Sequence, residues 1–227
     1  MARHGNSRHL NRLAASTYSR VSRKTVKYLA KPTSGRHSLG RSIALLVLLR
    51  DKLAFAANAR EARKMIKSGQ VAVNGSKVSD ASYPIGFGDV IALAQTKELY
   101  TVNVGKNGDI RLEKKEGTGK SRTLKVVGKY LAKGNKVMLR LYDGSLSAGD
   151  GKTMVNDSVV LDGRKIKSVL KFESGARCLV VKGAHASETG TIKAIKAGGA
   201  TSVAAVKVES SAGTFETPVE NVMVIGA

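Results

Sequence analysis

The chain has 227 residues, with 39 lysines and arginines against 17 aspartates and glutamates, a formal net charge of +22. This excess is far larger than solubility requires and predicts a polyanionic partner. Nucleic acid is favoured over a membrane, because each cation that neutralises a phosphate releases counterions and so strengthens binding. A membrane partner would also require hydrophobic anchors, and the longest apolar run, residues 43–49, is far short of the roughly 20 residues that span a bilayer.

The rare residue types narrow the chemistry further. The single cysteine, Cys178, cannot form an internal disulfide, and the four histidines show no spacing typical of a zinc site. We therefore expect a reducing, intracellular setting, no metal and no cofactor. Trp is absent and only ten residues are Phe or Tyr, which argues against aromatic stacking as the main means of recognition.

The N-terminal arm, residues 1–41, contains no acidic residue, and the first one in the chain is Asp51. Because such a segment repels itself, it should be extended or irregular until phosphates neutralise it. Two other interpretations stay open, an organellar transit peptide and a solvated tail. Nothing before Arg41 resembles a leader with a cleavage site, and scattered apolar residues such as Leu10 and Leu29 indicate a segment that docks.

Two helices should follow the arm. Residues 42–57 are rich in helix formers, with Ser42 placed as an N-cap, and the apolar first half of this stretch implies burial. A second helix is expected at 59–68. Asn58 and Glu61 form a variant of the capping box, and Gly69 supplies the left-handed stop.

Basic residues on the second helix are spaced at i, i+3, i+4 and i+7, so they form one ridge, opposite an apolar side. One interpretation of such a charge run is a solvated helix face without a partner. The alternative is an RNA-binding face, because an RNA backbone along the helix would offset the mutual repulsion of the cations. The ridge comprises Arg60, Arg63, Lys64 and Lys67, and the apolar side comprises Ala59, Ala62 and Ile66.

The stretch after this helix predicts a hairpin. Residues 71–78 alternate around Asn74-Gly75, the strongest short hairpin signal, and residues 83–93 add a turn and a strand. Helix pair and hairpin together resemble the small RNA-binding domain known as S-four. That resemblance implies that the ridge and the start of the hairpin grip the backbone of a structured RNA. It rests on Arg60, Arg63, Lys64, Gly69, Val71, Val73, Asn74, Gly75, Gly88, Asp89, Val90 and Ile91.

Residues 122–175 show short apolar alternations separated by Gly pairs and Asp-Gly, which predict an all-β segment, a small barrel. Residues 116–121 end like a P-loop but lack its first glycine, so no nucleotide site is expected. Asp143 lies in a stretch similar to the aspartate signature of pseudouridine synthases, with Tyr142 interrupting it. A hairpin turn is the favoured interpretation there.

Residues 176–195 resemble the KOW motif, a strand-loop-strand of ribosomal and transcription-elongation proteins whose glycines let the loop approach a partner closely. The matching residues are Gly183, His185, Gly190 and Ile192. Ser187 stands where ribosomal relatives often carry another glycine, and Ala184 replaces a common basic residue.

Taken in order, these segments and the closing residues 215–226 resemble the S-four-e family of small-subunit ribosomal proteins over nearly the whole chain, and the modest length favours its archaeal branch. We expect an α+β chain of four parts. These are a basic arm at 1–41, an S-four-type domain at 42–105, a central β domain at 106–171 and a KOW-like domain at 172–227, the last two resembling small β-barrels.

The expected function is that of a non-catalytic component of the small ribosomal subunit, in the cytoplasm, with ribosomal RNA and neighbouring ribosomal proteins as partners and with neither a membrane nor a small-molecule substrate. An RNA-modifying enzyme of the pseudouridine-synthase type is the alternative, and a transcription-elongation factor a third candidate. Predicted RNA contacts are Arg3, His4, Arg8, His9, Arg12, Arg20, Arg23, Lys24, Lys27, Lys31, Arg36, His37, Arg41, Arg60, Arg63, Lys64, Lys67, Asn74 and Lys77.

Overall fold

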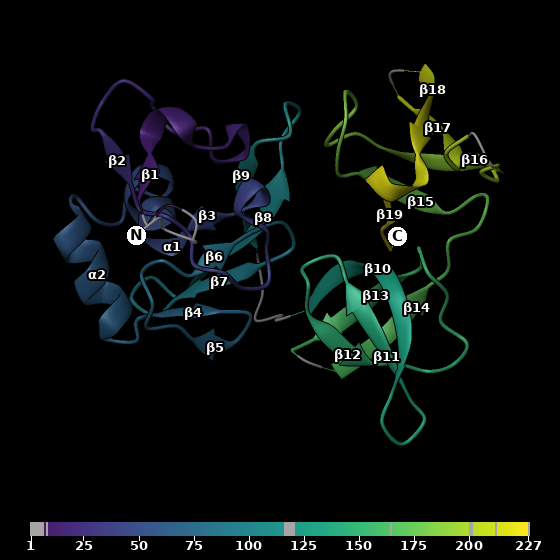
Figure 1. Cartoon of the computed structure of the whole chain (residues 1–227), viewed down its shortest axis with the longest axis horizontal. Helices are drawn as coiled ribbons and strands as arrows, with labels where there is room; N and C mark the ends of the chain where they lie inside the picture. The colour runs from purple at the N-terminus through teal and green to yellow at the C-terminus, as the bar shows by residue number, and fades with distance from the viewer. Residues whose placement is uncertain are drawn as a thin grey trace, which may run out of the picture. The chain divides into compact units, whose positions relative to one another are not determined.

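A computed structural model describes residues 7, 9–115, 121–163, 165–199, 202–211 and 213–226. Within these residues the protein is mainly β with few helices (Figure 1). It divides into two compact units, residues 1–102 with 112–116 and residues 103–111 with 117–227. No helix among the described residues is long and apolar enough to cross a membrane. Arg3, His4, Arg8 and most of the P-loop-like stretch lie outside the described residues.

The first sheet is antiparallel, with strand order β5-β4-β7-β8-β9. It continues past residue 105, the boundary expected for this part of the chain, to Lys115. A separate two-stranded pair joins β3 to β6. The strands are β3 (Ile43–Ala44), β4 (Val71–Val73), β5 (Ser76–Lys77), β6 (Pro84–Ile85), β7 (Val90–Leu93), β8 (Glu98–Val104) and β9 (Ile110–Lys115).

The first helix is shorter than the expected 42–57. Helix α1 covers Leu45–Val47 and continues as a π-helical turn, η4, over Leu48–Lys52. The apolar run at 43–49 is buried as predicted. The expectation that Ser42 caps the helix is wrong, because its hydroxyl donates instead to the carbonyl of Ser38 at 2.9 Å.

Long-range partners explain this late start. The amides of Leu45 and Leu46 donate to the carbonyl oxygens of Tyr83 and Ala81. The first amides of a helix have no hydrogen-bond acceptor within the helix, and these two carbonyls accept from them instead. A side-chain cap is therefore not needed, and the chain before Leu45 is free to pair with β6.

The described part of the arm is irregular, which is one of the two forms predicted, and it is folded rather than extended. Ala15, Tyr18 and Leu29 are buried, and the arm folds back on itself through a two-stranded pair, β1 with β2. Its elements are β1 (Leu10–Asn11), η1 (Arg12–Ala14), η2 (Thr17–Ser19), β2 (Tyr28–Leu29) and η3 (Leu39–Arg41).

The second unit carries two five-stranded antiparallel sheets, with orders β12-β11-β10-β13-β14 and β18-β17-β16-β15-β19. Each has its own apolar cluster, built around Leu124 and Leu139 in one and around Cys178 and Val206 in the other. The strands are β10 (Ser121–Ala132), β11 (Lys136–Leu141), β12 (Leu146–Ala148), β13 (Ser158–Asp162), β14 (Lys165–Leu170), β15 (Arg177–Val180), β16 (Thr189–Lys196), β17 (Ala205–Ser210), β18 (Gly213–Pro218) and β19 (Val222–Val224), with a 3-10 turn, η5, at Val219–Asn221.

Lys125 connects these two sheets. Its ammonium group is buried and donates to the carbonyl oxygens of Val219 at 2.6 Å and Val222 at 2.9 Å. Burial lowers the pKa of Lys125 to about 8, against a smaller raising effect of Glu220. The central and C-terminal sheets thus share a buried, hydrogen-bonded cation.

Candidate nucleic-acid interface

Helix α2 (Ala59–Lys67) carries the predicted ridge, and its N-terminus is fixed as the sequence indicates. The Asn58 side chain accepts from the amides of Arg60 and Glu61, each at 3.0 Å. The Glu61 carboxylate reaches back to the amide of Ala57 at 2.8 Å, one residue before the cap. Gly69 follows the helix at φ +72°, which confirms the left-handed stop.

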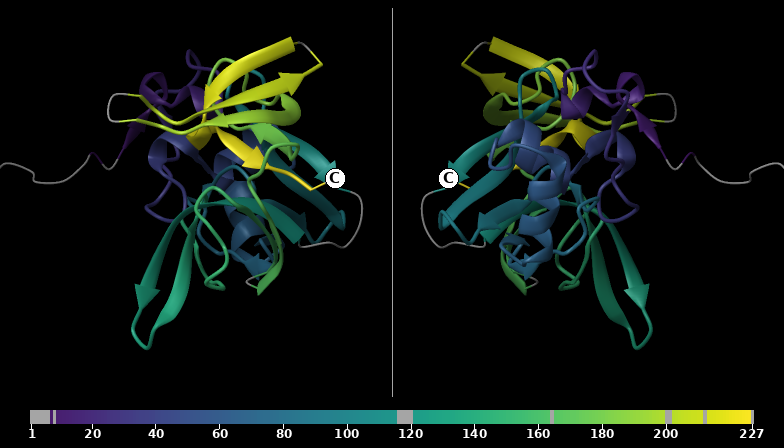
Figure 2. Two further views of the ribbon diagram at one scale, coloured as in Figure 1. Left: turned by 90° about the vertical axis from the view of Figure 1, so that its right-hand side faces the viewer. Right: turned by 90° about the vertical axis from the view of Figure 1, so that its left-hand side faces the viewer.

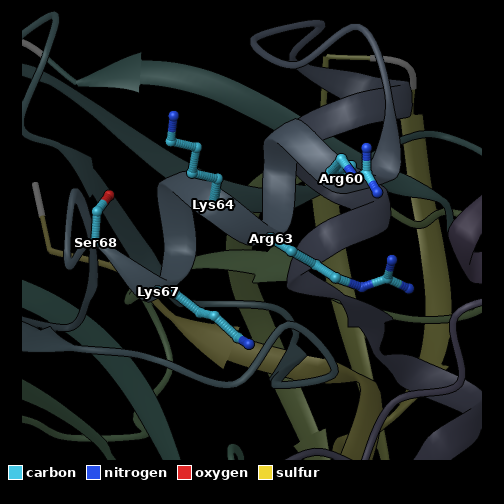
Figure 3. Close-up of a pocket in the computed structure, with 5 residues that line it drawn as sticks. All are labelled: Arg60, Arg63, Lys64, Lys67 and Ser68. Carbon is cyan, nitrogen blue, oxygen red and sulfur yellow. The ribbon is translucent and has the colours of Figure 1, made fainter.

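The inner side of α2 buries Ala62 and Ile66, so the ridge must face outward. All four ridge residues are exposed, and their side chains extend away from the helix (Figure 3). Within the part of the chain that the structure describes, none of the four head groups has a carboxylate partner. This helix therefore presents four uncompensated positive charges.

An open hollow of about 610 Å³ lies along this surface. Its lining consists of the four ridge residues and Ser68 (Figure 3). Ser68 is the one lining residue that was not predicted from the sequence. Its spacing, four residues after Lys64, would have placed it on the same side of the helix. The hollow is lined by four cationic head groups on aliphatic stems, and its positive charge suits an anionic backbone better than a neutral apolar ligand.

The hairpin after α2 confirms the predicted turn. Strands β4 and β5 pair with Val73 opposite Ser76, and Asn74 and Gly75 both adopt positive φ. A Cβ placed on Gly69 would lie 3.6 Å from Cδ of Lys77, so the Lys77 stem lies beside the end of α2. This exposed lysine extends the line of cations from the helix onto the hairpin.

Asn74 has a structural role in addition to the one predicted. Its side-chain amide donates to Asp89 at 2.7 Å, and its side-chain carbonyl accepts from the amide of Val90 at 2.9 Å. The structure uses the Asn74 side chain to hold the turn against β7. The side chain is half-buried, and its contact with RNA stays a prediction.

Asp89 is the centre of a buried network. It is 1 % exposed and accepts from His37 at 2.8 Å and from the amide of Gly86 at 3.0 Å, in addition to Asn74. Burial alone would raise the pKa of this carboxyl, but the hydrogen bond and charge of His37, with the bonds from Asn74 and Gly86, lower the pKa below its ordinary value. The network joins the arm to the hairpin turn.

Two predicted arm contacts are thereby excluded. His37 is buried against Asp89, and its ring occupies the space where a side chain on Gly86 would stand, so it cannot stack on RNA. The Arg12 side chain is 6 % exposed, donates to the carbonyl of Ser22 at 2.8 Å and faces Asp51 at 3.9 Å. Neither structural role could be predicted from the sequence, because the hydrogen-bond partners of His37 and Arg12 are distant in the chain or lie in loops.

The other described arm candidates are accessible to different degrees. Lys31 donates to the carbonyl of Ser7, and the Lys27 ammonium lies 5.4 Å from the centre of the Tyr28 ring. Lys31 and Arg36 are half-buried. The exposed ones are His9, Arg20, Arg23, Lys24, Lys27 and Arg41.

Asp143 has the geometry of a turn residue. It is fully buried, accepts from Arg122 at 2.8 Å and also accepts from the amide of Ser145 at 2.8 Å. Gly144 follows at φ +80°. A carboxylate held in this way has no access to a substrate, which supports the hairpin-turn interpretation. Among the described residues no group of three or more His, Cys, Asp or Glu could hold a metal.

The comparisons with known proteins agree with this geometry. Residues 45–91 match the S4 domain family, which covers α1, α2 and the hairpin. The chain is 34% identical to the small ribosomal subunit protein eS4 of Methanocella arvoryzae over 220 residues, 96% of this chain and 94% of the relative. It belongs to the eS4 family.

Other members show the same relationship. The eS4 protein of Methanothermobacter thermautotrophicus is 34% identical over 231 residues, 100% of this chain and 95% of the relative. The crystal structure of the 30S ribosomal protein S4e from Thermoplasma acidophilum superposes with a TM-score of 0.70 at 30% identity, covering 82% of this chain and 96% of that one. The eS4 resemblance inferred from the sequence is therefore confirmed, as is the S4 domain within it.

Proposed function

We propose that this protein is a non-catalytic component of the small ribosomal subunit that binds folded ribosomal RNA by its phosphates and shape. The observation that carries the proposal is the ridge of Arg60, Arg63, Lys64 and Lys67, four exposed cations without carboxylate partners in the described chain, inside a matched S4 domain. Like charges at this spacing repel one another, so a polyanion along the helix stabilises the arrangement.

Shape rather than base identity is the expected basis of recognition. The major groove of an A-form helix is too deep and narrow for side chains to read, whereas its phosphates are accessible to a row of cations. The ridge, Lys77 and the exposed arm cations are the proposed contacts with such a backbone. Enzymatic modification of RNA is not supported, because the relatives are ribosomal proteins and Asp143 is buried.

The salt dependence of binding tests the proposal. Full-length protein is titrated with transcribed small-subunit ribosomal RNA at several salt concentrations. Six to ten phosphate contacts imply an affinity that falls on the order of 10³ to 10⁵-fold between 50 and 200 mM salt. Arg63→Gln should reduce the slope of log affinity against log salt by about one and weaken binding to all sequences alike.

Lys106→Gln is the matched control, since Lys106 is an exposed lysine of the β8–β9 turn outside the ridge. Its slope should equal that of the unmodified protein. A shallow slope for the unmodified protein, or equal effects of the two substitutions, would count against the ridge as the phosphate contact.

The finer organisation is proposed on the same basis. The division at 41, 105 and 171 stays a prediction, as does the barrel character of the two later sheets. In support, the edge strands β12 and β14 approach each other. The KOW-like loop is supported by Gly183 and Ser187, which both adopt positive φ between β15 and β16. Neighbouring ribosomal proteins are the other proposed partners, and the cytoplasmic ribosome the proposed location.

A further inference from the structure

The outer side of β10, β11 and β12 is a second charged surface, separate in sequence from the ridge. Cross-strand pairs place Tyr130 opposite Met138, and Met138 opposite Ala148. Directly opposed residues point to the same side of an antiparallel sheet. The β10–β11 hairpin extends beyond the other strands of this sheet (Figure 2), so the surface lies on a projecting element.

The apolar cluster fixes which side is the outer one. Leu139 is fully buried and pairs with Lys129 on the inner side. Tyr130 and Met138 alternate with these residues and therefore point outward. Tyr130 is 42% exposed, and Leu146, which lies opposite Arg140 on the same side, is 53% exposed. An aromatic ring and a leucine side chain thus lie on the surface.

Two cations flank this apolar centre. Lys136 pairs with Ala132 near the hairpin tip, and Arg140 pairs with Gly128 on the other side of Tyr130. A Cβ on Gly128 would lie 3.7 Å from Nε and 3.9 Å from Nη2 of Arg140, so the guanidinium lies across the glycine, two residues along β10 from the tyrosine. Strands β10, β11 and β12 contain no acidic residue.

We propose that this surface binds an unpaired nucleotide of the ribosomal RNA, with the base stacked on Tyr130 and the adjoining phosphates held by Arg140 and Lys136. The inference rests on the proposed function and adds a second mode of contact to it. A base offers a π-face to an exposed ring, and a cation at each side matches the backbone on either side of that base.

A protein partner suits the surface less well. To match this surface, a protein partner would have to present an apolar patch with carboxylates at both ends. The segment 111–171 holds fifteen basic residues against six acidic ones, and this general excess of positive charge favours a polyanion. The few aromatic residues in this chain argue against stacking as the main means of recognition. They do not argue against a single stacking contact on a surface that phosphates already favour.

Affinity for transcribed small-subunit ribosomal RNA tests the proposal with three variants of the full-length protein. Tyr130→Ala should weaken binding about tenfold, within the range known for base stacking on aromatic side chains, and should leave the salt slope unchanged. Tyr130→Phe keeps the ring and should bind as the unmodified protein does. Arg140→Gln should lower the salt slope by about one.

Met154→Ala is the matched control, because Met154 is 71% exposed and lies outside these strands; its affinity should not change. Photocrosslinking of the complex, followed by mass spectrometry, should identify a nucleotide attached to the peptide that contains Tyr130. Thermal melting of each variant verifies folding.

The outcomes separate the two proposals. No binding of the unmodified protein to the RNA would overturn both. Weaker binding of Arg63→Gln, together with unchanged binding of Tyr130→Ala, would overturn this one alone. Unchanged RNA affinity with loss of the Tyr130→Ala protein from reconstituted subunits would also overturn it, and would assign the surface to a protein neighbour.

Discussion

Ser187 has a backbone conformation that favours glycine. It adopts φ +72° in the loop between β15 and β16, and its amide donates to the carbonyl of Val180 at 2.8 Å. A side chain in the left-handed region costs about 1 kcal/mol. The geometry of this loop therefore favours a residue without a Cβ at position 187.

Ser187→Gly should raise the free energy of unfolding by about 1 kcal/mol, because it removes this steric cost. Urea denaturation measures the change. Ser168→Gly is the control: Ser168 lies in β14 without a positive φ, so glycine should lower stability there by roughly 0.5 to 1 kcal/mol. Equal effects of the two substitutions would show that the loop conformation is not the cause.

His37 is the other residue whose role depends on a single contact. His37→Ala should destabilise the protein by about 2 to 3 kcal/mol, because the buried carboxylate of Asp89 loses the hydrogen bond from the imidazole. Chemical denaturation measures the loss. His9→Ala, at an exposed arm histidine, should change stability by less than about 0.5 kcal/mol. A small effect of His37→Ala would mean that Asp89 finds another donor.

At the scale of single elements, the N-terminal cap of α2 determines how firmly the ridge is held. Asn58→Ala removes the acceptor for the amides of Arg60 and Glu61 and should lower stability by about 1 kcal/mol. Asn58→Asp retains an acceptor and should restore most of this loss. Thermal melting compares the variants. If alanine and aspartate behave alike, the cap contributes nothing to the helix.

Helix α2 and its hairpin could be predicted from the sequence because their signals are local. The cap residue, the Gly69 stop and the Asn74-Gly75 turn each act within a few residues. The start of α1 could not, because the carbonyls of Ala81 and Tyr83 complete it. The burial of Arg12 and His37 could not be predicted either, because their partners are distant in sequence. Without knowledge of those partners, a basic side chain in a basic arm is interpreted as an RNA contact.

Across the whole molecule, the charge excess was the most informative property of the sequence, and the class of partner that it predicts agrees with membership of the eS4 family. The charge excess did not reveal which cations stabilise the fold and which are available to bind phosphate. Lys125 belongs to a strongly basic segment, yet its ammonium group is buried between two sheets rather than exposed to a phosphate. Such a lysine can be distinguished from an RNA-binding one only if the position of its acceptor is known, and that acceptor, the carbonyl of Val219, lies nearly one hundred residues later in the chain.

Lys125 also predicts a pH dependence. Its pKa is about 8 in the folded protein and 10.5 ordinarily. Between these values the unfolded chain holds a proton that the folded chain lacks, so stability should rise with pH, by roughly 3 kcal/mol over the interval. Below pH 8 the cost of burying the charge is fully present.

Denaturation of the unmodified protein and of Lys125→Met from pH 7 to 10.5 measures this contribution. The difference between the two curves is attributable to Lys125, because the other titrating groups are common to both. Stability of the unmodified protein should gain on that of the variant as pH rises. Parallel curves would show that burial does not lower the pKa of Lys125.

The bond between His37 and Asp89 has a consequence for truncation of this chain. A protein shortened to begin at residue 42 would keep every residue of the helix pair and the hairpin, yet it would leave a carboxylate inside them without its imidazole. The leading segment is thus an integral part of the domain that follows it, and its removal should destabilise that domain.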